Sequence, residues 1–304
     1  ADQRVLPLAQ GFDVAACEEM ARALTDGQRV PGMAMAIVQN GRVLSARGYG
    51  VTDVTSPQAI DSHTVFRLAS LSKAFAGTMA GLLVNDGSLR WDSKVTDYVP
   101  SFNLSDPAAT QRVTVADLLS HRVGLKSHTA FDRDIEANGE YYGVSQKLAS
   151  APLNCAPGQC YAYQNVAFSL IGDVVFAATG SFYDQAVDRR IFKPLGMNDA
   201  SIGLTGIESS SRWARPHVRS RNGWVSLMPK PTYYRLPPAA GVNASASDMA
   251  QWLIAQTGHR PDVLPAPLLA TLHAPIISTP GEMRSGWRRE RIHSASYALG
   301  WRVF

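Results

Sequence analysis

Hydrophobic residues recur at helical spacing over residues 12–24, and the segment ends near Gly27, a residue suited to closing a helix. The pattern then changes to two short apolar runs, 32–38 and 42–46, on either side of an Asn-Gly pair at 40–41. Asn-Gly is a strong hairpin signal because both central positions of the turn need a positive φ. The chain is therefore expected to open as helix, strand, turn, strand.

The middle of the chain has the periodicity of helices. Segment 71–85 is apolar nearly all round and closes at Gly87, which predicts a buried central helix. Further helical stretches are expected at 115–121, 165–178, 183–192 and 247–256. Residues 201–240 show no clear period and predict loops and short strands, and strand character returns at 297–304.

Composition and charge narrow the class of protein. With 304 residues, 45% of them hydrophobic and 18% charged, the chain is typical of a globular enzyme. The densest basic patch comprises Arg284, Arg288, Arg289 and Arg291 around Trp287, and we interpret it as a solvated loop, not a nucleic-acid site. No apolar run reaches the ~18 residues that a bilayer requires, so no membrane span is expected.

The cysteines give an indication of the cellular compartment in which the protein is found. Cys155 and Cys160 flank a turn-forming Ala-Pro-Gly-Gln stretch, which favours a small-loop disulfide, with two buried free thiols as the alternative. The chain begins at Ala1, as a mature chain does after its signal peptide is cut, although an engineered chain can begin in the same way. We therefore expect a periplasmic or secreted protein. Three separated cysteines give too few ligands for zinc, and neither a metal nor a cofactor is expected.

The search for reactive groups leads to one serine. The sequence contains no Gly-x-Ser-x-Gly, P-loop, Gly-x-Gly-x-x-Gly, His-Glu-x-x-His or Cys-x-x-Cys motif. Ser70 is the one serine that stands three residues before a lysine, Lys73, at the start of the apolar helical segment. This spacing places both side chains on one face of a helix. The alternative is a helix cap followed by a surface lysine, but Leu68, Leu71 and Phe75 give Lys73 an apolar setting.

Such a lysine can act as a base. Burial and the positive end of the helix dipole both disfavour its charged form, so Lys73 is expected to accept the proton of Ser70. The backbone N–H of Ser70 can supply half of an oxyanion hole.

A second motif is Tyr163-Gln-Asn165, the one Tyr-x-Asn among ten tyrosines. With it the sequence resembles class C β-lactamases, penicillin-binding D-Ala-D-Ala carboxypeptidases and related esterases, which carry Ser-x-x-Lys followed by Tyr-x-Asn. Segments similar to the family follow in family order: 66–73, 118–125, 157–158, 194–197, 240–249 and 297–301.

The resemblance implies the β-lactamase/transpeptidase-like α/β fold, an antiparallel sheet flanked by helices with a large inserted helical region. The expected division is 1–60 for the N-terminal helix and strands, 61–280 for the mainly helical region with the active site, and 281–304 for an incomplete return to the α/β part. The implied chemistry is hydrolysis through an acyl-enzyme on Ser70, without a cofactor. The substrate would be a small molecule or peptide: a β-lactam, a D-amino peptide or an ester. A non-catalytic β-lactam or peptidoglycan sensor is the alternative.

The resemblance also assigns roles to the second motif. Tyr163 would share the acid and base work with Lys73, and Asn165 would bind the substrate's amide and help to hold Lys73. A partly buried aromatic residue and a helix cap are the structural alternatives for these two positions. His121 lies in a family-like Leu-Leu-Ser-His segment and is expected to be structural, with a Ser-His-Asp triad as the competing arrangement.

One family motif is not found. Lys-Thr-Gly or His-x-Gly should follow the Tyr-x-Leu-Gly-Trp segment, but the sequence ends at Phe304, three residues after Trp301. Arg284-Ser-Gly precedes Tyr297 and is interpreted as a loop, and Arg122-Val-Gly belongs to another segment. We therefore expect the chain to be truncated or nicked. The remaining strands, the second oxyanion-hole N–H and a cation for a substrate carboxylate would then come from another piece.

Overall fold

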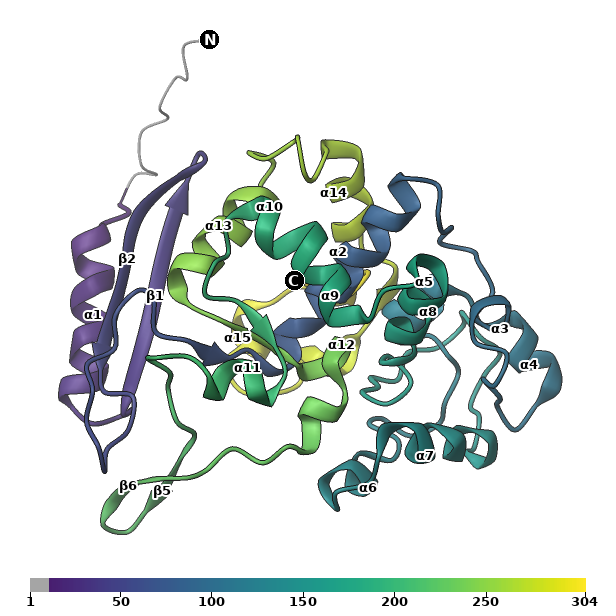
Figure 1. Cartoon of the computed structure of the whole chain (residues 1–304), viewed down its shortest axis with the longest axis horizontal. Coiled ribbons are helices and arrows are strands. Elements are labelled where there is room, and N and C mark those ends of the chain that lie inside the picture. The colour runs from purple at the N-terminus through teal and green to yellow at the C-terminus, as the bar shows by residue number, and fades with distance from the viewer. Residues whose placement is uncertain (1–10) are drawn as a thin grey trace. The chain divides into compact units, whose positions relative to one another are not determined.

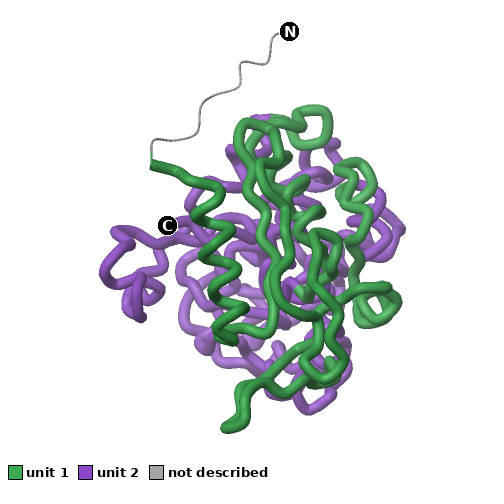
Figure 2. Tube along the Cα trace, turned by 90° about the vertical axis from the view of Figure 1, so that its left-hand side faces the viewer, with its two compact units in different colours: residues 1–67, 191–230, 243–265 green, residues 68–190, 231–242, 266–304 purple. Residues whose placement is uncertain are grey.

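The computed structural model describes residues 11–304, which fall into two units that interleave along the sequence (Figure 2). Unit 1 contains residues 11–67 together with 191–230 and 243–265. Unit 2 contains 68–190, 231–242 and 266–304. Each unit therefore brings together segments that lie far apart in the sequence.

Unit 1 opens with the predicted helix and hairpin. Helix α1 (Val14–Asp26) starts where the Asp13 side chain accepts a hydrogen bond from the N–H of Ala16, at 3.1 Å. Strands β1 (Gly32–Gln39) and β2 (Arg42–Gly50) pair antiparallel around the predicted Asn-Gly turn. Both turn residues have positive φ, +50° and +76°, which confirms the prediction. Helix α13 (Ala246–Gln256), predicted at 247–256, packs on the same hairpin as α1 (Figure 1).

The rest of unit 1 is made of short elements. One three-stranded sheet has the order β3 (Phe66–Arg67), β7 (Val242–Ala244), β4 (Ser201–Ile202), and β5 (His217–Ser220) pairs with β6 (Gly223–Ser226). The short helices of this unit are α10 (Lys193–Leu195) and α11 (Leu204–Glu208). The aperiodic segment 201–240 therefore contains short strands as expected, and short helical turns in addition.

Helix α2 (Ser72–Asn85) is the centre of unit 2. Its residues from Ser72 through Leu83 are all buried, as the apolar pattern predicted. Helices α5 (Val115–Leu119), α8 (Leu170–Thr179), α12 (Pro237–Ala240) and α14 (Ala266–His273) pack around it. A Cβ atom at Gly77 would overlap the carbonyl oxygen of Leu299, so glycine lets the segment 298–300 approach the helix closely.

Short helices and one small sheet complete unit 2. The helices are α3 (Val95–Tyr98), α4 (Pro107–Arg112), α6 (Asp132–Glu136), α7 (Tyr141–Gln146), α9 (Tyr183–Val187) and α15 (Arg288–Arg291). The sheet has the order β10 (Arg302–Val303), β9 (Ser296–Tyr297), β8 (Ile277–Ser278). In residues 11–304 no helix combines the length and the apolar character that crossing a membrane demands.

Two predicted helices have different boundaries. The helix expected over 165–178 begins only at Leu170, because Ser169, Leu170 and Ile171 donate to carbonyls three residues back and tighten the first turn. The helix expected over 183–192 is α-helical to Val187, and 188–192 continue as a wider π-helical turn.

Candidate active site

Ser70 lies in the turn η1 (Ala69–Leu71), which leads directly into α2. Ala69 has φ of +48°, a left-handed conformation that a residue with a Cβ adopts at an energetic cost. The Ser70 side chain is exposed, and its Oγ has two hydrogen-bond partners: Lys73 Nζ at 3.2 Å and Tyr163 Oη at 2.8 Å. The first sequence motif and the second therefore meet at this oxygen.

Lys73 is a buried lysine, with 1% of its surface exposed. Burial lowers its pKa to about 7, while the charge of Asp132 raises the pKa and that of Arg302 lowers it. Besides Ser70, Nζ is bonded to Asn165 Oδ1 at 2.7 Å and to the carbonyl oxygen of Ala239 at 3.1 Å. A neutral amine has two N–H groups and one lone pair. It can therefore donate to these two oxygens and still accept the Ser70 hydroxyl proton.

Tyr163 stands on the other side of the Ser70 hydroxyl. Its O–H donates to Ser70 Oγ, and its ring centroid is 4.5 Å from Lys73 Nζ. Burial raises the pKa of the Tyr163 phenol, and the hydrogen bond to Ser70 lowers it only in part. The phenol is consequently protonated at neutral pH, so it can donate its hydrogen bond to Ser70 Oγ.

Asn165 connects Lys73 to a carboxylate. The side chain is 8% exposed, its Oδ1 accepts from Lys73, and its Nδ2 donates to Asp132 Oδ2 at 2.7 Å. Both ends of the amide are therefore hydrogen-bonded within the cluster formed by Ser70, Lys73, Tyr163, Asn165 and Asp132, and the side chain does not cap a helix. The structure thus brings together Ser70, Lys73, Tyr163 and Asn165, the four residues singled out by the two motifs.

His121 is buried and packs on the ring of Tyr163. Its Nδ1 accepts the backbone N–H of Gln164 at 3.0 Å, and its ring centroid lies 4.5 Å from that of Tyr163. Burial lowers the pKa of His121 well below its ordinary value, so the ring is neutral. The Oγ of Ser70 is bonded to Lys73 and Tyr163, so this arrangement does not support a Ser-His-Asp triad.

Two charged residues of this site carry no sequence signal of their own. Asp132 follows no motif. Arg302 lies just after the Tyr-x-Leu-Gly-Trp segment, and its guanidinium carbon is 5.3 Å from the Tyr163 ring centroid. Arg302 also pairs with Glu282 at 3.4 Å. Both residues reach the cluster through tertiary folding, so spacing along the chain cannot reveal them.

Cys155 and Cys160 are joined in a disulfide a few residues before Tyr163, and Cys17 in α1 is a free cysteine. The loop also carries Gly158, whose N–H donates to the carbonyl of Arg122 at 2.7 Å. A covalent link of this span holds together the turn that precedes the second motif.

The disulfide gives the first testable prediction. Alkylation of the unfolded, unreduced protein should modify one thiol, Cys17, whereas prior reduction should expose three. Mass spectrometry of the intact protein counts the labels, and Cys17 serves as the internal control. Three labels without reduction would contradict the pairing. Since a short loop constrains the unfolded chain modestly, reduction should lower the free energy of unfolding by ~2 kcal/mol.

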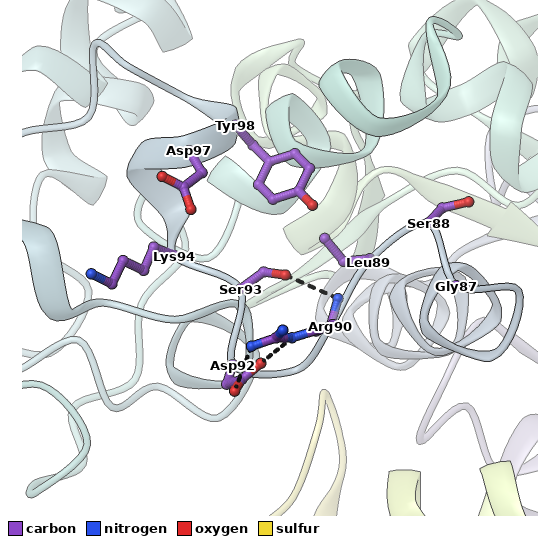
Figure 3. A pocket seen from close by; sticks show the side chains of 9 residues that line it. All are labelled: Gly87, Ser88, Leu89, Arg90, Asp92, Ser93, Lys94, Asp97 and Tyr98. Carbon is purple, nitrogen blue, oxygen red and sulfur yellow. Dashed lines mark hydrogen bonds and ion pairs between the residues drawn. The ribbon is translucent and has the colours of Figure 1, made fainter.

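A separate hollow in unit 2 is lined by nine residues that all lie between Gly87 and Tyr98 (Figure 3). Of its charged lining residues, Arg90 and Asp92 pair with each other at 2.8 Å and 3.0 Å. It contains none of the residues bonded to Ser70. Within residues 11–304 no group of three or more His, Cys, Asp or Glu side chains is arranged to hold a metal ion.

Comparison with known proteins shows which family the chain belongs to. A family model described as Beta-lactamase matches residues 17–304. Protein flp of Staphylococcus aureus (strain COL) is 26% identical over 274 residues, which cover 90% of this chain and 52% of that protein. Penicillin-binding protein 4 of Amycolatopsis lactamdurans is 28% identical over 290 residues, covering 91% of this chain and 74% of that protein. The chain thus spans about half the length of the first of these relatives.

Solved structures agree on the fold. The octameric penicillin-binding protein homologue from Pyrococcus abyssi superposes with a TM-score of 0.81 at 22% identity, covering 96% of this chain and 65% of that one. EstCE1, a hydrolase with promiscuous acyltransferase activity, superposes with a TM-score of 0.74 at 18% identity, covering 94% and 81%. These neighbours confirm the β-lactamase/transpeptidase-like fold predicted from the sequence.

Proposed function

The chain belongs to the Beta-lactamase family, and on that premise we propose that it is a serine hydrolase that acts through an acyl-enzyme on Ser70. The observation that carries the proposal is the double hydrogen bond at Ser70 Oγ, which joins a buried lysine on one side to a protonated tyrosine on the other. A nucleophile beside a base that is itself held by further groups is the arrangement that covalent catalysis requires.

In the proposed acylation step, Ser70 Oγ attacks the carbonyl carbon of the substrate while its proton passes to the lone pair of Lys73. The bond to the leaving nitrogen or oxygen then breaks, and the Tyr163 O–H supplies the proton that this atom takes up. The protonated Lys73 returns a proton to the Tyr163 oxygen, so the proton count balances. A water molecule, activated by the same pair, hydrolyses the ester on Ser70 in the reverse sequence of transfers.

For the substrate, we propose β-lactams or D-amino peptides, with simple esters as the second candidate. Support for the first comes from the penicillin-binding proteins among the similar chains, and for the second from EstCE1. The cation Arg302 beside Tyr163 is compatible with an anionic substrate, which favours the first class. A disulfide is typical of oxidising compartments, which supports a periplasmic or secreted location.

Covalent labelling followed by turnover tests this proposal. The protein is incubated separately with a penicillin, a D-Ala-D-Ala peptide and a p-nitrophenyl ester, and both adduct mass and product release are measured. We expect one adduct per chain on the peptide that contains Ser70, and repeated turnover of at least one substrate. An adduct on a different residue would contradict the assignment of the nucleophile. A stable Ser70 adduct without turnover would instead support the sensor alternative.

A further inference from the structure

Tyr163 and Gln164 of the second motif are hydrogen-bonded to a segment that lies more than thirty residues earlier in the sequence. Residues 127–130 and the Tyr163-Gln164 pair are joined by a seam of four hydrogen bonds, one between two backbone groups and three between a backbone group and a side chain. Its members are Thr129 N–H to Tyr163 O (2.6 Å), Tyr163 N–H to His128 Nδ1 (3.0 Å), Ala130 N–H to Gln164 Oε1 (3.0 Å) and Gln164 Nε2 to Ser127 O (2.7 Å). This seam fixes the start of α6, where Asp132 is the first residue, against Asn165.

Asp132 determines which way the Asn165 amide faces. An amide side chain has a donor end and an acceptor end that can exchange places by rotation. A carboxylate only accepts hydrogen bonds, so Asp132 Oδ2 selects the orientation in which Nδ2 faces it at 2.7 Å. The carbonyl oxygen Oδ1 is thereby left facing Lys73 Nζ, also at 2.7 Å.

The charge of Asp132 has few other partners. Its Oδ1 is buried and has no hydrogen-bond partner among the described residues. The Tyr233 hydroxyl has one proton to donate, and it lies 2.5 Å from Glu136 Oε1 but 3.4 Å from Asp132 Oδ2. Its stronger hydrogen bond is therefore the one to Glu136. Burial raises the pKa of Asp132 and so does the charge of Glu136, whereas the hydrogen bonds from Asn165 and Tyr233 and the charge of Lys73 lower it. Of the two hydrogen bonds that this carboxylate accepts among the described residues, the one from the Asn165 amide is therefore much the shorter, at 2.7 Å.

We propose that Asp132 is a positioning residue for the Ser70–Lys73 pair, acting through the Asn165 amide on the orientation of Lys73 and through its charge on the readiness of Lys73 to take up a proton. The proposal rests on the proposed function, in which Lys73 is the base. Asp132 itself touches neither Ser70 nor Lys73 in the hydrogen bonds described above.

The variant Asp132→Asn tests both proposed effects of Asp132: the effect through the Asn165 amide on the orientation of Lys73 and the effect of its charge on proton uptake by Lys73. The carboxamide is of similar size but neutral, and it can donate as well as accept, so the Asn165 amide loses its single orientation. We expect the acylation rate above neutral pH to fall by about tenfold, the effect of about one hydrogen bond to a charged group. Loss of the negative charge should also move the acidic limb of the rate profile down by about one pH unit. Arg302, Tyr163 and His121, the other titratable groups around Lys73, are unchanged in this variant.

Glu136→Gln is the matched control. It removes a carboxylate from the same helix, one that binds Tyr233 and has no bond to Asn165, so both the rate and the acidic limb should stay at their wild-type values. In an Asn165→Ala background, Asp132→Asn should cause no further rate loss but should still shift the acidic limb. This split between rate and pH profile distinguishes a positioning role from a merely structural one.

The outcomes are distinguishable. Asp132→Asn with wild-type rate and profile, or a Glu136→Gln variant with the same changes, would overturn the role of Asp132 while leaving Ser70 acylation intact. Absence of any Ser70 adduct in the wild-type protein would overturn both this inference and the proposed function. Thermal unfolding verifies that each variant folds, and Asp132→Ser, neutral and smaller, replaces Asp132→Asn with the same expectations if the latter does not.

Discussion

Ser70→Ala should abolish covalent labelling by penicillin or an activated ester and reduce turnover by about 10⁴-fold or more. The expectation follows from the position of Ser70 Oγ between Lys73 Nζ and Tyr163 Oη, which gives this oxygen both a proton acceptor and a proton donor. Alanine removes the nucleophile and leaves the turn η1 otherwise unchanged. Peptide mass mapping and steady-state rates measure the two effects.

Ser72→Ala is the matched control for this variant, since it lies one residue past the turn and is fully buried. Its Oγ accepts the backbone N–H of Val242 at 2.9 Å, so the substitution leaves a buried donor without its partner. We expect the free energy of unfolding to fall by about 1–3 kcal/mol while the Ser70 adduct still forms. A Ser70→Ala variant that is still labelled, or that turns over normally, would show that Ser70 is not the nucleophile.

The features predicted correctly from the sequence depend on neighbouring residues. The hairpin follows from an Asn-Gly pair between apolar runs, and the buried helix follows from an apolar surface on every side of 72–83. Ser70 and Lys73 meet because three-residue spacing at the start of a helix places them on one face. Tyr163 and Asn165 were found through a second motif whose proximity to the first came from family resemblance, not from periodicity.

Features that depend on distant segments were not predicted. Asp132 follows no motif, and Arg302 follows a family-like segment without belonging to it. The Ala239 carbonyl that binds Lys73 is a backbone group that no residue identity reveals. Each unit of the structure also combines three separate stretches of chain, which local sequence patterns do not connect. Helix boundaries also moved where local hydrogen bonds tightened or widened a turn, as at 166–171 and 188–192. Hydrophobic period alone does not distinguish these variants of a helix.

Lys73→Arg is expected to lower the acylation rate by about 10²–10⁴-fold, the usual contribution of a general base. Since burial lowers the pKa of Lys73 to about 7, the wild-type rate should be level above that pH and fall about tenfold per unit below it, as the amine becomes protonated. An arginine stays protonated throughout this range and cannot accept the proton of Ser70. The variant should therefore acylate slowly at every pH in this range and should show no acidic limb near pH 7. A profile of kcat/KM against pH records both effects.

Two further variants separate loss of the base from loss of the fold. Lys147→Arg changes a lysine that pairs with Asp134 at 2.5 Å at the surface, and it should keep the wild-type profile. Lys73→Met fills the buried site without a charge but leaves Asn165 Oδ1 and the Ala239 carbonyl without this donor. It should therefore fold with reduced stability, which thermal unfolding measures, and acylate as slowly as Lys73→Arg. If Lys73→Arg were acylated at the wild-type rate, Lys73 would not be the base. The neutral His121, which contacts the Tyr163 ring, would then be the group to test next.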